Sequence, residues 1–290
     1  MKGFCTHYKK KIKEAVYIVI AVLVIALFLF PLIWSLPYSL KDGREVFKMS
    51  EVGGSISWFP EKPCWDNFQE VFKVDVNGGR FLNALLSTFV VASCNCFFSI
   101  LINMLAAYGF ARFNFKFKNV IFTYLLFFMF VPGIAIQLTS IKVVSELNMI
   151  NTIFVLFVPG MANSYSIFFF RQYFLNIPDS VEEAAMLDGA SRLKILISIF
   201  VPLSVTPMII IGVGAFLGSW NSYIWPTLVI TENEGTLTQV SQILYMLKSV
   251  NSHDYGVVIA SCIIAMIPPL ILFFIFQKKL VEGIAISGLK

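Results

Sequence analysis

Long apolar runs dominate the chain and are separated by short polar segments. Six of these runs contain no Asp, Glu, Lys, Arg or His, and they span residues 15–36, 81–111, 119–141, 149–170, 195–230 and 255–277. A transmembrane helix needs about 20 mostly apolar residues, and each run is long enough to supply them. The pattern predicts an all-α integral membrane protein with six transmembrane helices.

The first and fifth runs carry further information. The first is bulky throughout and continues to Pro31 and Trp34, whereas a cleavable signal peptide has a shorter apolar core and a small-residue cleavage site. We therefore expect it to be a retained first transmembrane helix. The fifth run contains Pro202 and Pro207, and because proline removes backbone hydrogen bonds and bends helices, this span is predicted to be kinked.

Basic residues indicate the orientation, because short loops rich in Lys and Arg remain in the cytoplasm. Most of the 22 Lys and Arg residues fall in the segments that are inside if the N-terminus is inside. The prediction is an N-in, C-in topology. It divides the chain into a basic cytoplasmic lead (1–14), a first transmembrane helix (15–36), an extracellular loop (37–80), a core domain (81–277) with a cytoplasmic loop (171–194), and a cytoplasmic tail (278–290).

Composition agrees with a protein whose solvent is the lipid bilayer. Hydrophobic residues make up 58% of the chain and charged residues only 13%, far from the values of an average soluble domain. The net charge of +5 follows from the excess of inner Lys and Arg, so no nucleic acid partner is needed to explain it. The outer loop is rich in Gly and Pro and predicts irregular structure with short elements such as residues 65–72.

Polar residues in the second span fall at steps of four or eight: Asn83, Ser87, Asn95, Ser99 and Asn103. This spacing places them along one helix face. Polar groups within a membrane form hydrogen bonds between helices or line a water-filled path. Both interpretations remain open, and Asn95 and Ser99 are candidates for a substrate path.

The loop between the fourth and fifth spans predicts a short surface helix. Ser180 and Glu183 fit a capping box, so the helix should begin near Ser180, and Gly189 should end it in a left-handed turn. Val181, Ala184 and Ala185 would then form a shallow face, and Glu182 and Asp188 could meet basic residues of a partner protein. The alternative is an amphipathic helix on the membrane surface, but such helices are usually basic with bulky anchors.

The chain contains no convincing nucleotide site. A P-loop needs G-x-x-x-x-G-K-[ST], and the closest segment, residues 283–290, fails because Leu289 separates Gly288 from Lys290. Any ATP hydrolysis would therefore take place on another polypeptide. The five cysteines show neither a disulfide framework nor zinc-ligand spacing, and we expect no metal site, no cofactor and no catalytic residue on this chain.

The segment Glu183-Ala184-Ala185 followed by Asp188-Gly189-Ala190, with Pro202 beyond, closely resembles the "EAA" loop of binding-protein-dependent ABC importer permeases. The resemblance continues through residues 106–113, 131–132, 170–174 and the tail at 281–290. It implies the transmembrane domain of a type I ABC importer, in which this loop forms a coupling helix seated on an ATPase subunit. The ATPase-coupling residues would be Glu182, Glu183, Ala184, Ala185, Asp188 and Gly189.

Residues 218–226 resemble the fifth-span signature of sugar-importer permeases of the maltose type. Aromatic rings with neighbouring amides suit sugars, so Trp220, Asn221, Tyr223 and Trp225 join Asn95 and Ser99 as candidates for the substrate path. An aromatic belt at the membrane interface explains Tyr223 and Trp225 equally well.

The resemblance implies a bacterial cell membrane protein that works with a second homologous permease, two ATP-binding subunits carrying ATP and Mg, and an extracellular solute-binding protein. Its solute would be a sugar or oligosaccharide. The alternative is an ion-coupled secondary transporter of a polar solute. Proton relays usually place ionisable residues within the spans, and the six apolar runs contain none, although a sodium site made of neutral oxygens remains compatible with the sequence.

Overall fold

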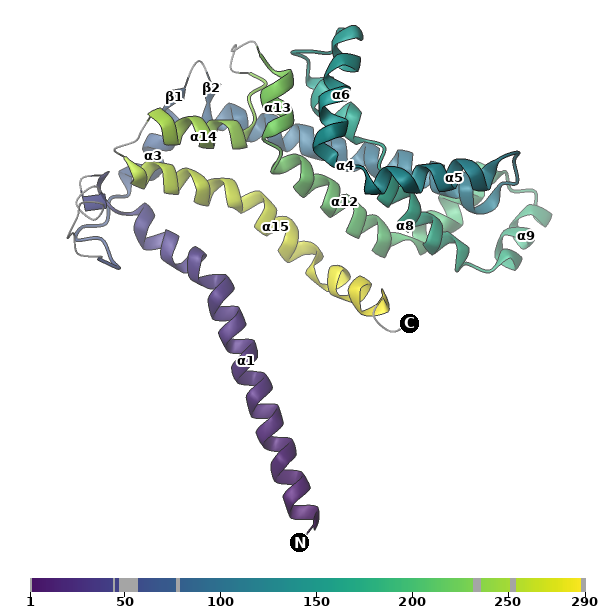
Figure 1. Ribbon diagram of the computed structural model, residues 1–290, viewed down its shortest axis with the longest axis horizontal. Coiled ribbons are helices and arrows are strands. Elements are labelled where there is room, and N and C mark those ends of the chain that lie inside the picture. Colours follow the sequence, from purple (N-terminus) through teal and green to yellow (C-terminus); the bar gives the residue numbers. More distant parts are fainter. Residues whose placement is uncertain are drawn as a thin grey trace. The chain divides into compact units, whose positions relative to one another are not determined.

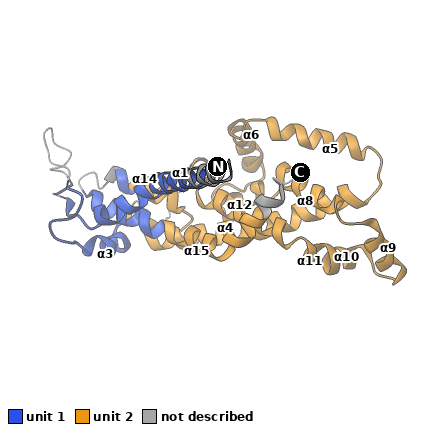
Figure 2. Cartoon of the chain, turned by 90° about the horizontal axis from the view of Figure 1, so that it is seen from below, with its two compact units in different colours: residues 1–74, 247–265 blue, residues 75–246, 266–290 orange. Residues whose placement is uncertain are grey.

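A computed structural model describes residues 2–43, 45–46, 57–76, 79–231, 236–250 and 254–287 (Figure 1). The end of the predicted tail, residues 288–290, and parts of the predicted outer loop lie outside the described residues. The chain forms two compact units, one of residues 1–74 with 247–265 and the other of residues 75–246 with 266–290 (Figure 2).

The first unit contains the long helix α1 (Lys2–Ser39), which continues three residues beyond the predicted end of the first span. Its apolar part, Lys13–Ser39, contains an 18-residue window with a mean hydropathy of 3.1 in which no residue is buried inside the protein. Side chains of this kind are stable when they face lipid. The unit also contains α3 (Asp66–Lys73), which is the short element expected near residues 65–72.

Asn67 of α3 joins three segments of this unit. Its side-chain amide donates hydrogen bonds to the carbonyls of Ser39 at 2.7 Å and Lys41 at 2.9 Å. Gly256, near the start of α15 (Tyr255–Ser287), packs against the same amide, and a Cβ atom there would lie only 2.4 Å from Asn67 Nδ2. The close approach therefore requires glycine at position 256.

The second unit begins with a small antiparallel hairpin of β1 (Asp75–Val76) and β2 (Gly79–Arg80), in which Asp75 pairs with Arg80 and Val76 with Gly79. The hairpin leads directly into α4 (Phe81–Arg112), the second predicted span. Helix α4 packs along its length against α8 (Ser164–Leu175) and α12 (Val205–Trp220), as Figure 1 shows.

Gly212 sets the distance between α4 and α12. A Cβ atom at this position would lie 2.8 Å from Ile100 Cδ1 and 3.2 Å from Cys96 Sγ, which is too close for an unshifted side chain. Lipid provides no hydrophobic driving force for the association of transmembrane helices, so they associate through close packing. Small residues such as glycine permit this close approach.

The third, fourth and fifth predicted spans are each broken into two helical segments. The third bends by 108° between residues 118–130 and 133–146, the fourth by 47° between 153–160 and 164–175, and the fifth by 83° between 192–203 and 205–220. The segments are α5 (Lys118–Phe127), η1 (Phe128–Phe130), α6 (Gly133–Glu146), α7 (Ile153–Phe157), η2 (Val158–Gly160), α10 (Arg192–Ile195), η3 (Leu196–Phe200) and α11 (Val201–Leu203).

Within the described residues, three long helices and three bent pairs account for the six predicted spans. The predicted kink of the fifth span is confirmed, and its residues 221–230 form a separate short helix, α13 (Ile224–Val229). The bend of the third span occurs at Pro132, whose ring prevents helix continuation. The last two helices are α14 (Val240–Val250) and α15.

Candidate functional site

The cytoplasmic segment after α8 is built around α9 (Asp179–Leu187), which begins one residue before the predicted start. Its N-cap is Pro178, and no side chain caps it, so the predicted capping box of Ser180 and Glu183 is wrong. Two carboxylates in the first turn, Asp179 and Glu182, interact favourably with the positive end of the helix dipole instead.

The end of α9 agrees with the sequence prediction. Gly189 follows the C-cap Asp188 with a φ of 77°, the left-handed conformation that glycine adopts without steric cost. The chain then turns, and the hydroxyl of Ser191 accepts a hydrogen bond from the backbone N–H of Lys194 at 3.3 Å, which caps α10.

Most of the predicted coupling residues lie at the surface of α9 and its turn. Glu183, Ala184, Asp188 and Gly189 are exposed. Ala185 is half-buried and packs against the buried cluster that includes Tyr108 and Phe174. Leu187, which the sequence reading did not single out, is 90% exposed at the end of the helix. These residues form a surface that combines two carboxylates with small and apolar side chains.

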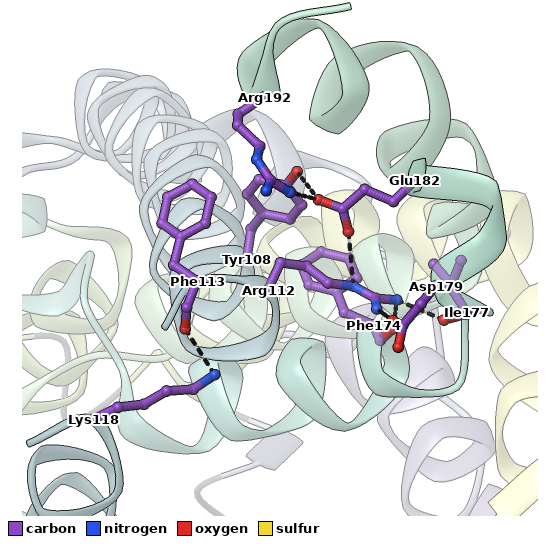
Figure 3. Close-up of polar contacts among 9 residues, drawn as sticks. All are labelled: Tyr108, Arg112, Phe113, Lys118, Phe174, Ile177, Asp179, Glu182 and Arg192. Atoms are coloured by element: carbon purple, nitrogen blue, oxygen red, sulfur yellow. Dashed lines mark hydrogen bonds and ion pairs between the residues drawn. The ribbon is translucent and has the colours of Figure 1, made fainter. Parts of the chain in front are cut away.

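Glu182 differs from the other predicted coupling residues because it is buried. Its Oε1 accepts hydrogen bonds from Tyr108, at 3.1 Å, and from Arg192, and its Oε2 lies 3.4 Å from Nε of Arg112 (Figure 3). The expectation that Glu182 meets basic residues of a partner is corrected by this geometry, because its cationic partners belong to its own chain.

Arg112, the last residue of α4, is the centre of these contacts, and its side chain is 6% exposed. Besides Glu182, it pairs with Asp179 and donates to the carbonyls of Phe174 at 2.8 Å and Ile177 at 2.5 Å. Figure 3 shows these groups converging on the guanidinium. One residue therefore ties the end of α4 to the end of α8 and to the first turn of α9.

Three buried aromatic rings pack beside Arg112 and against one another. Arg112 lies over the ring of Phe200 at 5.2 Å, and the ring of Tyr108 packs edge-on against Phe200 at 5.0 Å. Phe174 contacts both rings, and all three aromatic residues are buried. Because the side chains of Arg112 and Glu182 are both only 6% exposed, the ion pair between them is screened less than surface pairs are.

A second feature is a cavity of about 780 Å³ where the three broken spans meet. Its polar lining consists of neutral amides and hydroxyls, together with aromatic rings. The polar and aromatic lining residues include Asn95, Gln137, Ser140, Asn163, Tyr165, Ser219, Ser222 and Trp225. The helix breaks at residues 131–132 and 161–163 lie at this cavity, where irregular backbone can be hydrated.

The structure divides the predicted path residues. Asn95 and Trp225 line the cavity, and Trp225 is fixed by a hydrogen bond from its ring N–H to the carbonyl of Val155 at 2.9 Å. Trp220 is buried against Phe216, at a ring distance of 5.6 Å.

The other predicted path residues are also outside the cavity lining. Asn221 is exposed, and the ring of Tyr223 packs against that of Tyr245 at 5.3 Å. Ser99 is buried and accepts a hydrogen bond from Asn103 at 2.9 Å.

Asn103 shows what the polar face of α4 does on the cytoplasmic half of the helix. Its amide donates to the carbonyl of Met161 at 2.9 Å and accepts from the backbone N–H of Asn163 at the same distance. These bonds satisfy the backbone at the break of the fourth span. Interhelical hydrogen bonding therefore describes Asn103, whereas the bond that Ser99 accepts stays within α4 and Asn95 also reaches the cavity.

Several residues of both sites were absent from the sequence prediction. Arg112, Tyr108 and Arg192 were not linked to α9, although Tyr108 and Arg112 lie in the segment 106–113 that resembles the family. Gln137, Ser140 and Asn163 of the cavity lie near helix breaks. Pro132 is the sequence feature that indicates the break nearest to Gln137 and Ser140. The ion pair between Arg112 and Asp179 joins residues that are 67 positions apart, so the local sequence does not indicate it.

Comparisons with known proteins identify the family of the chain. The family model of the binding-protein-dependent transport system inner membrane component matches residues 99–286. The sn-glycerol-3-phosphate transport system permease protein UgpE of Salmonella typhi is 31% identical over 92% of this chain and 94% of its own length. The arabinooligosaccharides transport system permease protein AraQ of Bacillus subtilis is 30% identical over 91% of each chain.

The fold is also similar to a solved structure. A chain of a bacterial ABC transporter involved in the import of the acidic polysaccharide alginate matches with a TM-score of 0.76 and 20% identity, covering 92% of this chain and 96% of that chain. The chain belongs to the binding-protein-dependent transport system inner membrane components, and it is a permease subunit of an ABC importer.

Proposed function

We propose that this chain and a second, homologous permease enclose the path for a neutral, hydroxyl-rich solute, a sugar or an oligosaccharide. An extracellular binding protein delivers the solute, and two separate ATPase subunits, which bind ATP and Mg, drive its passage. The observation that carries the proposal is the cavity between the broken spans, because its amides, hydroxyls and aromatic rings match the groups of a sugar.

The surface of α9 supports the proposed contact with an ATPase. Its exposed small and acidic residues share the helix with three exposed apolar side chains, Val181, Met186 and Leu187, and we infer that a protein partner covers them. Arg112 and Glu182 hold the base of this helix against α4. A push on α9 would thus be transmitted to a helix that lines the cavity through Asn95.

The relatives transport chemically different solutes, as their names state: a phosphorylated polyol, arabinooligosaccharides and an acidic polysaccharide. The neutral amides and hydroxyls of this cavity favour an uncharged carbohydrate over the two anionic solutes. An anionic solute is usually bound by charge-assisted hydrogen bonds, and the amides of Asn95 and Asn163 offer uncharged ones.

The test is uptake into proteoliposomes that contain the assembled importer and its binding protein. The panel of solutes includes labelled arabinooligosaccharides, maltooligosaccharides and sn-glycerol-3-phosphate. Replacing Asn95 by Ala should lower sugar uptake about tenfold, because a hydrogen-bonding amide at the cavity wall is lost.

The matched control is Asn221→Ala, which removes the same amide from an exposed position outside the cavity lining. This variant should retain wild-type uptake. Uptake that depends on Asn221 and not on Asn95 would refute the cavity as the path, and selective uptake of glycerol phosphate would refute the neutral solute.

A further inference from the structure

A second cavity, of about 390 Å³, lies on the surface where α4 turns into α5. It combines two cations with two amides and aromatic rings. The lining residues are Asn114, Phe115, Phe117, Lys118, Asn119, Val120 and Arg171. No part of this cavity coincides with the cavity between the broken spans or with the exposed surface of α9.

The two cations are held in place by backbone carbonyls. Lys118 Nζ donates to the carbonyl of Phe113 at 2.8 Å (Figure 3), and Arg171 Nε donates to the carbonyl of Phe110 at 3.2 Å. The guanidinium of Arg171 also lies 4.1 Å from the centre of the Phe122 ring. Each side chain therefore keeps donors for a ligand, because an ammonium has three N–H groups and a guanidinium five.

The charge of this cavity is not neutralised by nearby carboxylates. Among the described residues, the ion pairs include neither Lys118 nor Arg171. The cavity also adjoins the first turn of α5, whose dipole favours an anion. Two fixed cations, amides and a helix N-terminus together favour a phosphate group.

The surface beside the cavity is suited to acyl chains. Phe117, which precedes α5, and Val120, Ile121 and Tyr124 on the helix are all about half exposed or more, and they form an apolar face next to the basic cavity. The turn between α4 and α5 lies on the cytoplasmic side in the N-in topology. This side of the membrane carries anionic lipids, and basic pockets at this level bind their headgroups.

We propose that this cavity binds the phosphate headgroup of an anionic phospholipid, with Lys118 and Arg171 on the phosphate and the acyl chains along the apolar face of α5. A free phosphate ion would use the same two cations and would gain nothing from that face. The lipid would brace the turn beside Arg112, the residue that holds α9.

The experiment is native mass spectrometry of the purified, assembled importer during titration with phosphatidylglycerol. Lys118→Gln should weaken binding of the first lipid about fivefold, because one cation at the headgroup is lost. Lys116→Gln is the matched control, because this variant removes the same charge from the same turn. The side chain of Lys116 lies over the Phe117 ring and does not line the cavity. Lys116→Gln should leave lipid binding unchanged.

Further measurements distinguish a lipid headgroup from a free phosphate ion and from a protein partner. Phosphatidylcholine should bind equally to both variants, and millimolar inorganic phosphate should fail to displace the lipid. Equal binding of phosphatidylglycerol by both variants, or displacement by inorganic phosphate, would overturn the lipid site. Loss of the ATPase subunits from Lys118→Gln with unchanged lipid binding would assign the cavity to a protein contact instead.

Discussion

Two adjacent glutamates in α9 have opposite surroundings. Glu182 is buried beneath two arginines and a tyrosine, whereas Glu183 is exposed on the surface that we assign to the ATPase. Their neighbouring positions place them about 100° apart around the helix, so only one of them can face the end of α4. The first belongs to the anchor of the helix and the second to its proposed docking surface.

Replacing Arg112 by Met should destabilise the importer, because it removes a buried cation that pairs with Glu182 and also leaves two backbone carbonyls without their donor. The expected loss is about 3–5 kcal/mol, the range for removing one partner of a buried ion pair. The melting temperature of the purified complex measures it. Arg192→Met removes the other arginine, which is 46% exposed, and should cost less than about 1 kcal/mol. Equal shifts would contradict the central role of Arg112.

Reversing the charge of Glu183 should break coupling without unfolding the chain. Glu183→Lys changes an exposed residue, so stability should stay within about 0.5 kcal/mol, while solute uptake falls and the chain still reaches the membrane. Glu146→Lys, an exposed reversal at the end of α6, is the control and should transport normally. Normal uptake by Glu183→Lys would remove this residue from the coupling surface.

At the scale of elements, the sequence predicted helix positions better than helix bends. The six apolar runs located the spans because burial in lipid leaves a continuous signal. The kink of the fifth span followed from its two prolines, and the turn after α9 followed from Gly189. Pro132 is a local signal for the break in the third span, whereas the break in the fourth span involves tertiary bonds to Asn103, which the local sequence does not encode.

Gly189 should tolerate no bulky side chain without loss of coupling. No atom lies within 4 Å of a Cβ built there, so the cost of Gly189→Val comes from its positive φ alone, about 1–2 kcal/mol. The turn would relax and re-aim α10, and we expect reduced uptake at normal membrane abundance. Gly214→Ala, on α12 with equally open space and an ordinary φ, should transport as the wild type does. Wild-type uptake by Gly189→Val would contradict the rigid turn.

At the scale of the whole molecule, the distribution of Lys and Arg and the helix count support one topology, with α9 in the cytoplasm. Composition alone indicates a membrane protein, and the family follows from motifs between residues 106 and 290. The composition of the cavity could not be predicted, because it forms only when three broken spans meet.

Cysteine labelling in a cysteine-free background tests this topology. A cysteine at the highly exposed Leu187 should react with a membrane-impermeant maleimide only in inside-out vesicles, prepared without the ATPase subunits that we propose cover this position. A cysteine at Phe59, which is 76% exposed in the predicted outer loop, should react only in right-side-out cells. Labelling of both positions from the same side would refute the six-span arrangement.

The ion-paired anchor of α9 bears on how such importers can be recombined. A chimera that grafts residues 178–194 onto another permease separates Glu182 and Asp179 from Arg112 and Tyr108, which lie about 70 residues earlier on α4. The grafted carboxylates would then face a foreign helix end. The smallest exchangeable module is therefore discontinuous in sequence: the loop together with the last turns of α4, so designed hybrids that aim to re-pair permeases with new ATPases should move both pieces at once.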